Sequence, residues 1–172
     1  RFSAYLRNKF NKEFTNILYV TAGKIPADYI KAFGKQYPDK LFKVLVPVTK
    51  LNRDLQKTQI SFNFYLQNKQ HSVTLYKFPK NRDNIEILGL YSTSWEDKNI
   101  CDFQNLALYT KAVRICAKEL APKIIHSEAK IPFFLGAEFE SKLRYPAKVI
   151  QFIDDFAEYE ISRHEAFWAL IN

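Results

Sequence analysis

Two spacings of hydrophobic residues alternate along the chain. Short, largely apolar runs, typical of buried strands, span residues 16–22, 42–47, 85–91, 123–127 and 147–153. Between them, apolar residues three or four positions apart predict helices over residues 27–36, 103–120, 132–143 and 163–171. Asp102 stands where a side chain caps the 103–120 helix, and Pro122 ends that helix.

One stretch changes to a period of two. Apolar residues at 60, 62, 64 and 66 alternate with polar residues and Tyr65, and residues 71–78 repeat this pattern. The four residues between the two halves, 67–70, are all polar. The stretch therefore predicts an antiparallel hairpin with one face toward solvent.

Strands that alternate with helices predict an α/β fold. We expect a Rossmann-like parallel sheet with helices on both faces and right-handed crossovers, and the hairpin as an antiparallel insertion. Residues 16–172 are predicted to form this lobe, and residues 1–15 an N-terminal extension or helix. The last helix stops with no cap or breaker, so we expect the lobe to be truncated at its C-terminal end.

Composition excludes several classes of protein. Of the 172 residues, 47% are hydrophobic and 16% aromatic, which excludes a disordered chain. No apolar run is long enough to span a membrane and no secretory leader is apparent, so a cytoplasmic protein is expected. Cys101 and Cys116 have no C-x-x-C spacing, which makes a zinc site or a disulfide framework unlikely. The four glycines form neither G-x-G-x-x-G nor a P-loop.

The net charge of +8 is concentrated in the first third of the chain. Residues 1–57 hold twelve basic residues against four acidic ones, whereas the other residues balance. A coding bias toward Lys, Asn, Ile, Phe and Tyr is the favoured interpretation. A basic patch for anions or nucleic acid is the alternative.

Several stretches occur in the order of a known family. The run at 42–47 ends in a proline, and the 103–120 helix is followed by Pro122-Lys123-Ile124-Ile125-His126, which is similar to P-D-I-[IV]-H. With the strand at 16–22, the hairpin and the strand near 147–153, this order resembles the N-terminal lobe of bacterial glycogen and plant starch synthases. These are GT-B glycosyltransferases with two Rossmann-like lobes. The resemblance implies glucosyl transfer from a nucleotide-sugar such as ADP-glucose to an α-glucan, a second lobe downstream and no separate cofactor.

The ligand loops depart from the family pattern. Where the family has K-x-G-G-L, this chain has Gly23-Lys24-Ile25-Pro26-Ala27, and where it has H-x-H-D-W, this chain has His126-Ser127-Glu128-Ala129-Lys130. Asp154 and Asp155 replace His-Asn in a third loop. The resemblance implies substrate binding by Lys24, His126, Glu128, Asp154 and Asp155, and it identifies no catalytic residue and no metal ligand.

Each candidate also has an ordinary structural interpretation. Lys24 would contact a phosphate or lie in solvent. His126 would bind a ligand or be a hydrogen-bonded core residue. Glu128 would contact a sugar hydroxyl, act as a general base or be an exposed loop carboxylate. The aspartates at 154 and 155 would bind a sugar or cation, or cap a helix. His71 and His164 are expected at the surface.

The leading hypothesis is a divergent glucosyltransferase lobe that is inactive alone. Because all three loops are altered, the alternative is a non-catalytic glucan-binding or protein-interaction module on the same fold. A weaker alternative is anion or nucleic-acid binding by the basic first third.

Overall fold

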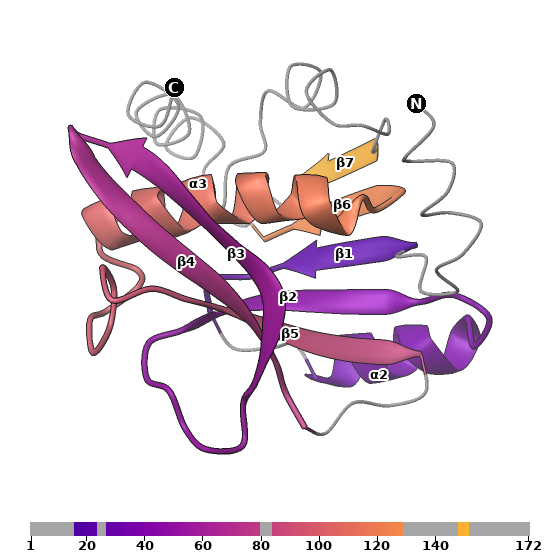
Figure 1. The fold of residues 1–172 in the computed structure, drawn as a ribbon. Helices are drawn as coiled ribbons and strands as arrows, with labels where there is room; N and C mark the ends of the chain where they lie inside the picture. Colours follow the sequence, from indigo (N-terminus) through magenta and orange to yellow (C-terminus); the bar gives the residue numbers. More distant parts are fainter. Residues whose placement is uncertain (1–15, 24–26, 80–83, 129–147, 152–172) are drawn as a thin grey trace.

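Seven strands form one mixed sheet in the computed structural model, which describes residues 16–23, 27–79, 84–128 and 148–151 (Figure 1). They are β1 (Ile17–Val20), β2 (Phe42–Val48), β3 (Gln56–Leu66), β4 (Lys69–Lys77), β5 (Ile85–Tyr91), β6 (Ile124–Ser127) and β7 (Lys148–Gln151). Their order across the sheet is β3-β4-β5-β2-β1-β6-β7.

The sheet has a parallel part and an antiparallel extension. Strands β5, β2, β1, β6 and β7 pair in parallel, whereas β4 pairs antiparallel with both β3 and β5. The β3–β4 hairpin therefore lies at one edge of a Rossmann-like sheet, which confirms the predicted fold class.

A helix covers each face of the sheet. Helix α3 (Phe103–Leu120) buries Leu106, Tyr109 and Val113 in the larger core, which also holds β1, β2, β4 and β5 side chains. Helix α2 (Ala27–Gln36) packs Ile30 on the other face, against β2 and β5. Both helices have the bounds that the sequence predicts. The helices expected at 132–143 and 163–171 lie outside the described residues.

The two ends of α3 are formed differently from the prediction. Asp102 occupies the position before the helix, but its side chain makes no capping hydrogen bond. Its Oδ1 atom instead accepts a hydrogen bond from Asn99 Nδ2 at 3.0 Å. At the other end, Ala121 adopts a left-handed conformation (φ 44°) and its N–H donates to Ala117 O, so that the chain leaves the helix just before Pro122.

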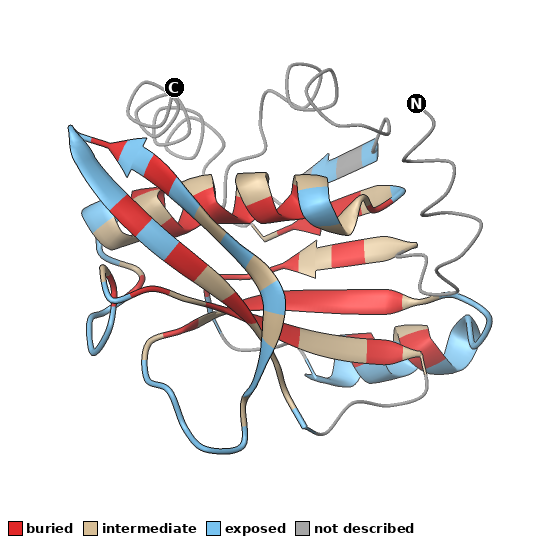
Figure 2. Ribbon diagram, in the orientation of Figure 1, coloured by how far each residue is buried: buried red, intermediate tan, exposed pale blue. Residues whose placement is uncertain are grey.

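Burial alternates along the hairpin, as predicted, whereas β2 is buried over most of its length (Figure 2). The connection is shorter than the four polar residues at 67–70. Only Gln67 and Asn68 form the turn, with φ of 51° and 58°. Positive φ at both central residues is typical of a type I′ turn, whose twist matches that of the strands. The strands therefore extend to Leu66 and from Lys69.

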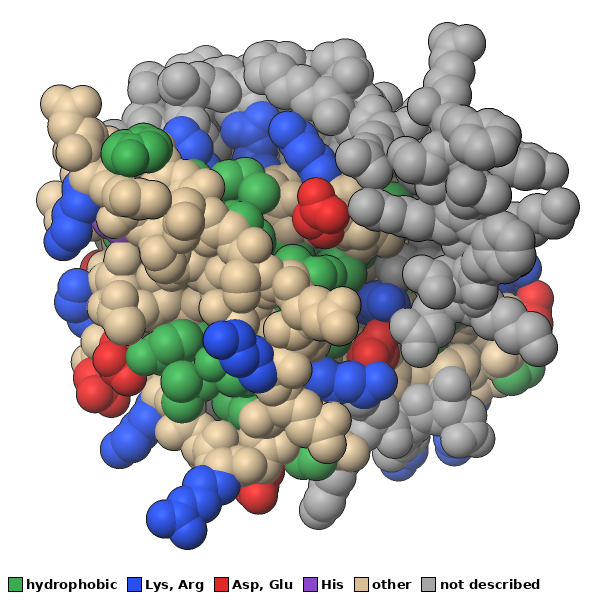
Figure 3. All heavy atoms as spheres, in the orientation of Figure 1, with side chains coloured by type: hydrophobic (Ala, Val, Ile, Leu, Met, Phe, Trp, Pro, Cys, Tyr) green, Lys and Arg blue, Asp and Glu red, His purple; other side chains and the backbone are tan. Residues whose placement is uncertain are grey.

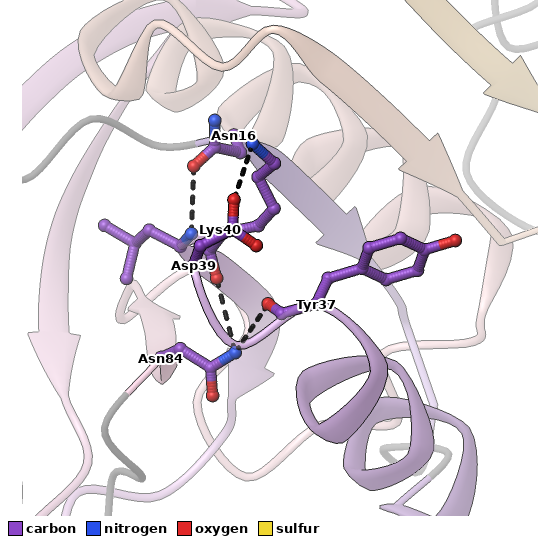
Figure 4. Close-up of polar contacts among 6 residues, drawn as sticks. Asn16, Tyr37, Asp39, Lys40 and Asn84 are labelled. Carbon is purple, nitrogen blue, oxygen red and sulfur yellow. Dashed lines mark hydrogen bonds and ion pairs between the residues drawn. The ribbon is translucent and has the colours of Figure 1, made fainter.

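The amino-terminal edge of the sheet is held by side-chain amides (Figure 4). Asn84 Nδ2 lies 2.9 Å from Gly34 O, 3.1 Å from Tyr37 O and 3.3 Å from Lys40 O, carbonyls at the end of α2 and in the turn that follows. Asn16 Oδ1 accepts a hydrogen bond from Leu41 N–H at 2.9 Å. These contacts satisfy backbone groups after α2, so this edge has a structural role.

Neither described helix is long and apolar enough to cross a membrane.

Both cysteine thiols are free. Cys116 lies on the buried face of α3, and burial raises the pKa of its thiol to about 12.

Candidate functional site

The order of the strands reverses between β1 and β6, and the carboxyl ends of these two strands form the switch point of the sheet. From β1 the chain adds β2 and later β5 on one side, and α3 then returns it to β6 on the other side of β1. In open α/β sheets, ligands bind beyond the carboxyl ends of the strands where the order reverses in this way. The candidate site therefore consists of residues 21–23 after β1 and Glu128 after β6.

Glu128 joins the two loops of this site. Its carboxylate Oε2 accepts hydrogen bonds from the Thr21 hydroxyl and from Ala22 N–H, the latter at 3.0 Å. Its own N–H donates to Val20 O at 3.0 Å. Gly23 N–H donates to Thr21 Oγ1, also at 3.0 Å. The carboxylate thus holds the β1 loop in place, and the two backbone amides after Thr21 both donate within the protein.

Among the described residues of the site, Glu128 is the one charged group. Thr21, Ala22 and Ser127 are buried, whereas Gly23 is exposed and Glu128 is half-buried. A Cβ atom on Gly23 would lie 3.7 Å from Glu128 Oε1, so the exposed glycine and the carboxylate are neighbours. A fixed carboxylate of this kind accepts hydrogen bonds from hydroxyl groups and repels phosphates.

Two aromatic residues support the β1 loop from beneath. Tyr109 on α3 donates its hydroxyl hydrogen bond to Thr21 O at 3.0 Å. Burial raises the pKa of Tyr109 well above its ordinary value, with smaller contributions from Cys116 and Glu128. Trp95 packs edge-on against Tyr109, with ring centroids 5.9 Å apart. The position of Thr21 therefore depends on the core under α3.

His126 lies in the interface between the sheet and α2. It is 9% exposed, and its ring contacts Tyr19 and Tyr29 edge-on at centroid distances of 5.0 and 5.8 Å. Tyr29 Oη is 3.3 Å from His126 Nδ1. This environment matches the interpretation of His126 as a hydrogen-bonded core residue. Ligand binding by His126 stays a prediction.

Burial lowers the pKa of His126, which makes stability depend on pH. The unfolded chain binds a proton near the ordinary pKa of 6.5, whereas the folded protein resists protonation. The contribution of neutral His126 to stability is therefore fully present above that pH and is lost as the pH drops below it. We expect His126→Phe, which keeps an aromatic ring, to lose less stability than the wild type between about pH 7.5 and 5.5. Urea unfolding at both pH values tests this, and equal losses in the two proteins would contradict it.

The structure describes only part of the predicted site. Lys24, Asp154 and Asp155 lie outside the described residues, and their substrate contacts stay predictions. Glu128 is placed at the switch point, in the predicted loop. Sequence reasoning did not identify Thr21, Tyr109 or Trp95 as its supports, because their contacts join segments far apart in the chain.

The expectation that His71 lies at the surface is wrong. His71 is 6% exposed, and its Nδ1 is 2.7 Å from Ser94 Oγ. Its ring stacks on Phe64, with ring centroids 5.4 Å apart. The signal was present in the sequence, since the period of two places His71 on the same face as Val73 and Leu75. His164 lies outside the described residues.

The basic residues of the first third lie on several elements. Lys31 and Lys35 are on α2, Lys57 is on β3, and Lys43 is buried in an ion pair with Glu86. On the face in view in Figure 3, basic side chains lie at several separate places, with acidic and apolar side chains among them. Within the described part of the chain, no group of three or more His, Cys, Asp or Glu side chains is placed to hold a metal ion.

No protein-family model and no curated protein sequence matches this chain. Among solved structures, it is similar to the catalytic domain of starch synthase IV from Arabidopsis thaliana bound to ADP and acarbose, with a TM-score of 0.57 and 14% sequence identity. The chain has a glycosyltransferase-like fold. The similarity covers 80% of this chain and 33% of that one, so this chain spans about a third of the starch synthase structure. At this level of identity, the similarity shows the fold alone.

Proposed function

We propose that this chain is the N-terminal lobe of a glucosyltransferase of the glycogen and starch synthase type. With a second lobe, it would transfer glucose from a nucleotide-sugar such as ADP-glucose to an α-glucan. The fold supports this proposal, and the similar starch synthase IV domain was solved with ADP and acarbose. In this proposal the substrate binds at the carboxyl ends of β1 and β6, where an open α/β sheet binds its ligand.

The observation that carries the proposal is the Glu128 carboxylate at the switch point. It is held by Thr21 and Ala22, and it lies beside the exposed Gly23. A carboxylate held in one orientation accepts hydrogen bonds from neighbouring sugar hydroxyls without a large loss of side-chain entropy. We therefore assign Glu128 to the binding of the glucan.

The same geometry argues against a phosphate in the β1 loop. The N–H groups of Ala22 and Gly23 already donate to Glu128 and Thr21, so they are not available to an incoming phosphate. The charge of Glu128 would also repel it. In this proposal the second lobe holds the nucleotide phosphates, and this lobe contributes the glucan side of the cleft.

A non-catalytic glucan-binding module is the second candidate. In the resembled family, the backbone of this loop approaches the sugar-nucleotide. Here the N–H groups of Ala22 and Gly23 donate to the protein itself, which favours the binding module. Both candidates require glucan binding at Glu128. They differ in whether a donor nucleotide is used.

Titration with maltoheptaose tests both candidates, with calorimetry as the measurement. We expect Glu128→Gln, which keeps the shape of the side chain, to weaken binding about tenfold, the loss of one charge-assisted hydrogen bond. Asp54→Asn, an exposed carboxylate after β2, is the control and should bind like the wild type. Absence of binding by the wild type at millimolar maltoheptaose would contradict both candidates. If the wild type binds maltoheptaose, glucose transfer from ADP-glucose by the full-length gene product would favour the enzyme over the binding module.

A further inference from the structure

A cavity lies away from the switch point. It has a volume of about 220 Å³ and is formed by the tip of the β3–β4 hairpin, the β5–α3 loop and the first turns of α3. Figure 1 shows the hairpin tip beside the start of α3. Strands β5 and β2 separate β4 from β1, which corresponds to about 14 Å across the sheet. The cavity is therefore not part of the site at Glu128.

The cavity is basic. Its described lining contains Lys69 and Lys98 and no carboxylate. The positive charges of both lysines act on His71, so both ammonium groups lie near the same imidazole. The nearby loop holds three acidic residues: Asp102 accepts a hydrogen bond from Asn99, Glu96 bonds to Tyr91, and the charge of Asp97 also acts on Tyr91.

The floor of the cavity contains hydrogen-bonded polar groups. His71 is buried and bonded to Ser94 Oγ at 2.7 Å, and Lys98 Nζ donates to Ser94 O at 2.7 Å. These bonds connect the imidazole and one ammonium group through Ser94. The side chains of Gln104 and Asn105 from α3 add amide groups to the lining.

We propose that this cavity binds a compact oxyanion, either inorganic phosphate or the phosphate group of a small phosphorylated molecule. Two ammonium groups with neighbouring amide and hydroxyl donors match the several acceptor oxygens of a phosphate. The volume is below the roughly 300–1,000 Å³ of sites for drug-sized ligands, which favours a small ligand. This inference does not depend on the proposed glucan binding.

Binding of an anion has a specific signature at His71. Burial, and after it the charges of the two lysines, lower the pKa of the imidazole, with an opposing contribution from the backbone of Leu66. Lys69 and Lys98 are the other titratable groups that line the cavity. A bound phosphate would offset their charges and favour the protonated imidazole. The pKa of His71 should therefore rise on binding.

The test is an NMR titration of the protein with sodium phosphate and with glycerol 3-phosphate at constant ionic strength. We expect saturable shifts of the His71 ring signals and the Ser94 amide, with a rise in the pKa of His71. Tighter binding of glycerol 3-phosphate than of phosphate would indicate an organic phosphate as the ligand, and equal or weaker binding would indicate phosphate itself.

The double variant Lys69→Gln/Lys98→Gln should bind at least about tenfold more weakly, because it removes two charged donors. Both lysines are exposed, so the variant should fold, and its thermal midpoint checks this. The control is Lys35→Gln/Lys57→Gln, which removes two exposed lysines on α2 and β3 and should bind like the wild type. Shifts at His71 that do not saturate, or equal weakening in the control, would overturn the proposal. Neither result would affect the test of Glu128.

Discussion

Replacing Glu86 with Leu is expected to lower the free energy of unfolding by about 3–5 kcal/mol, because it leaves the charge of Lys43 buried without its partner. Lys43 is 7% exposed, and its Nζ atom is 3.2 Å from Glu86 Oε2 across the β2–β5 pair. Lys77 Nζ, on β4, is 2.6 Å from Glu86 Oε1. One carboxylate thus forms ion pairs with two ammonium groups, of which one is buried. Urea unfolding at neutral pH measures the loss.

Two further variants control this result. Lys43→Met/Glu86→Leu removes both buried charges and should recover most of the lost stability. Lys77→Met removes the half-exposed partner and should cost no more than about 1 kcal/mol. If Glu86→Leu costs no more than Lys77→Met, the buried ion pair is not important for stability.

The same carboxylate gives a pH dependence. Burial alone would raise the pKa of Glu86, but hydrogen bonds and charges from Lys77 and Lys43 outweigh it and lower the pKa. The ion pairs therefore stabilise the fold above the ordinary carboxyl pKa of 4.5, and this contribution is lost as the pH falls through the lower value in the folded protein. The wild type should accordingly lose more stability in acid than Lys43→Met/Glu86→Leu.

Trp95→Ala is expected to cost about 3–5 kcal/mol, the range for loss of a large buried aromatic side chain. Trp95 is 0% exposed, its Nε1 donates to Val48 O at 3.2 Å, and it packs on Tyr109. The substitution leaves a cavity next to Tyr109, which holds Thr21. We therefore also expect the amide signals of residues 21–23 to shift in this variant.

Trp95→Phe is the matched control, because it keeps a ring against Tyr109 but loses the hydrogen bond to Val48 O. It should be less destabilising than Trp95→Ala, by about 1–3 kcal/mol. Urea midpoints of the two variants and the wild type make the comparison. A wild-type midpoint for Trp95→Ala would contradict the assignment of Trp95 as a main support of the core.

The hydrophobic pattern was sufficient for most of the architecture. Helices 27–36 and 103–120 and strand 85–91 have the predicted bounds. The two helices bury one face at helical spacing, whereas strand 85–91 was predicted from a short apolar run. Local details were predicted less well. Asp102 bonds to Asn99 instead of capping α3, and Gln67 adopts a positive φ that its residue type does not favour. Both outcomes depend on neighbouring loops and strands rather than on local preference.

The candidate site could be predicted only in part. The resemblance pointed to Glu128, but not to its bond with Thr21, which is 107 residues away in the sequence. That contact exists because β6 pairs with β1, and the order of strands in a sheet is not visible in the spacing of apolar residues. Trp95 lies in a loop between β5 and α3 with no periodic pattern, so its burial had no signal of that kind.

The most direct test of the site is an NMR titration with maltoheptaose, read at every backbone amide. The switch-point assignment predicts saturable shifts at Thr21, Ala22, Gly23 and Glu128 that share one binding curve, with little change at His71. It also predicts that Glu128→Gln moves this curve to higher maltoheptaose concentration. Binding that leaves residues 21–23 and 128 unshifted, or that is the same in Glu128→Gln, would contradict the assignment of function to the ends of β1 and β6.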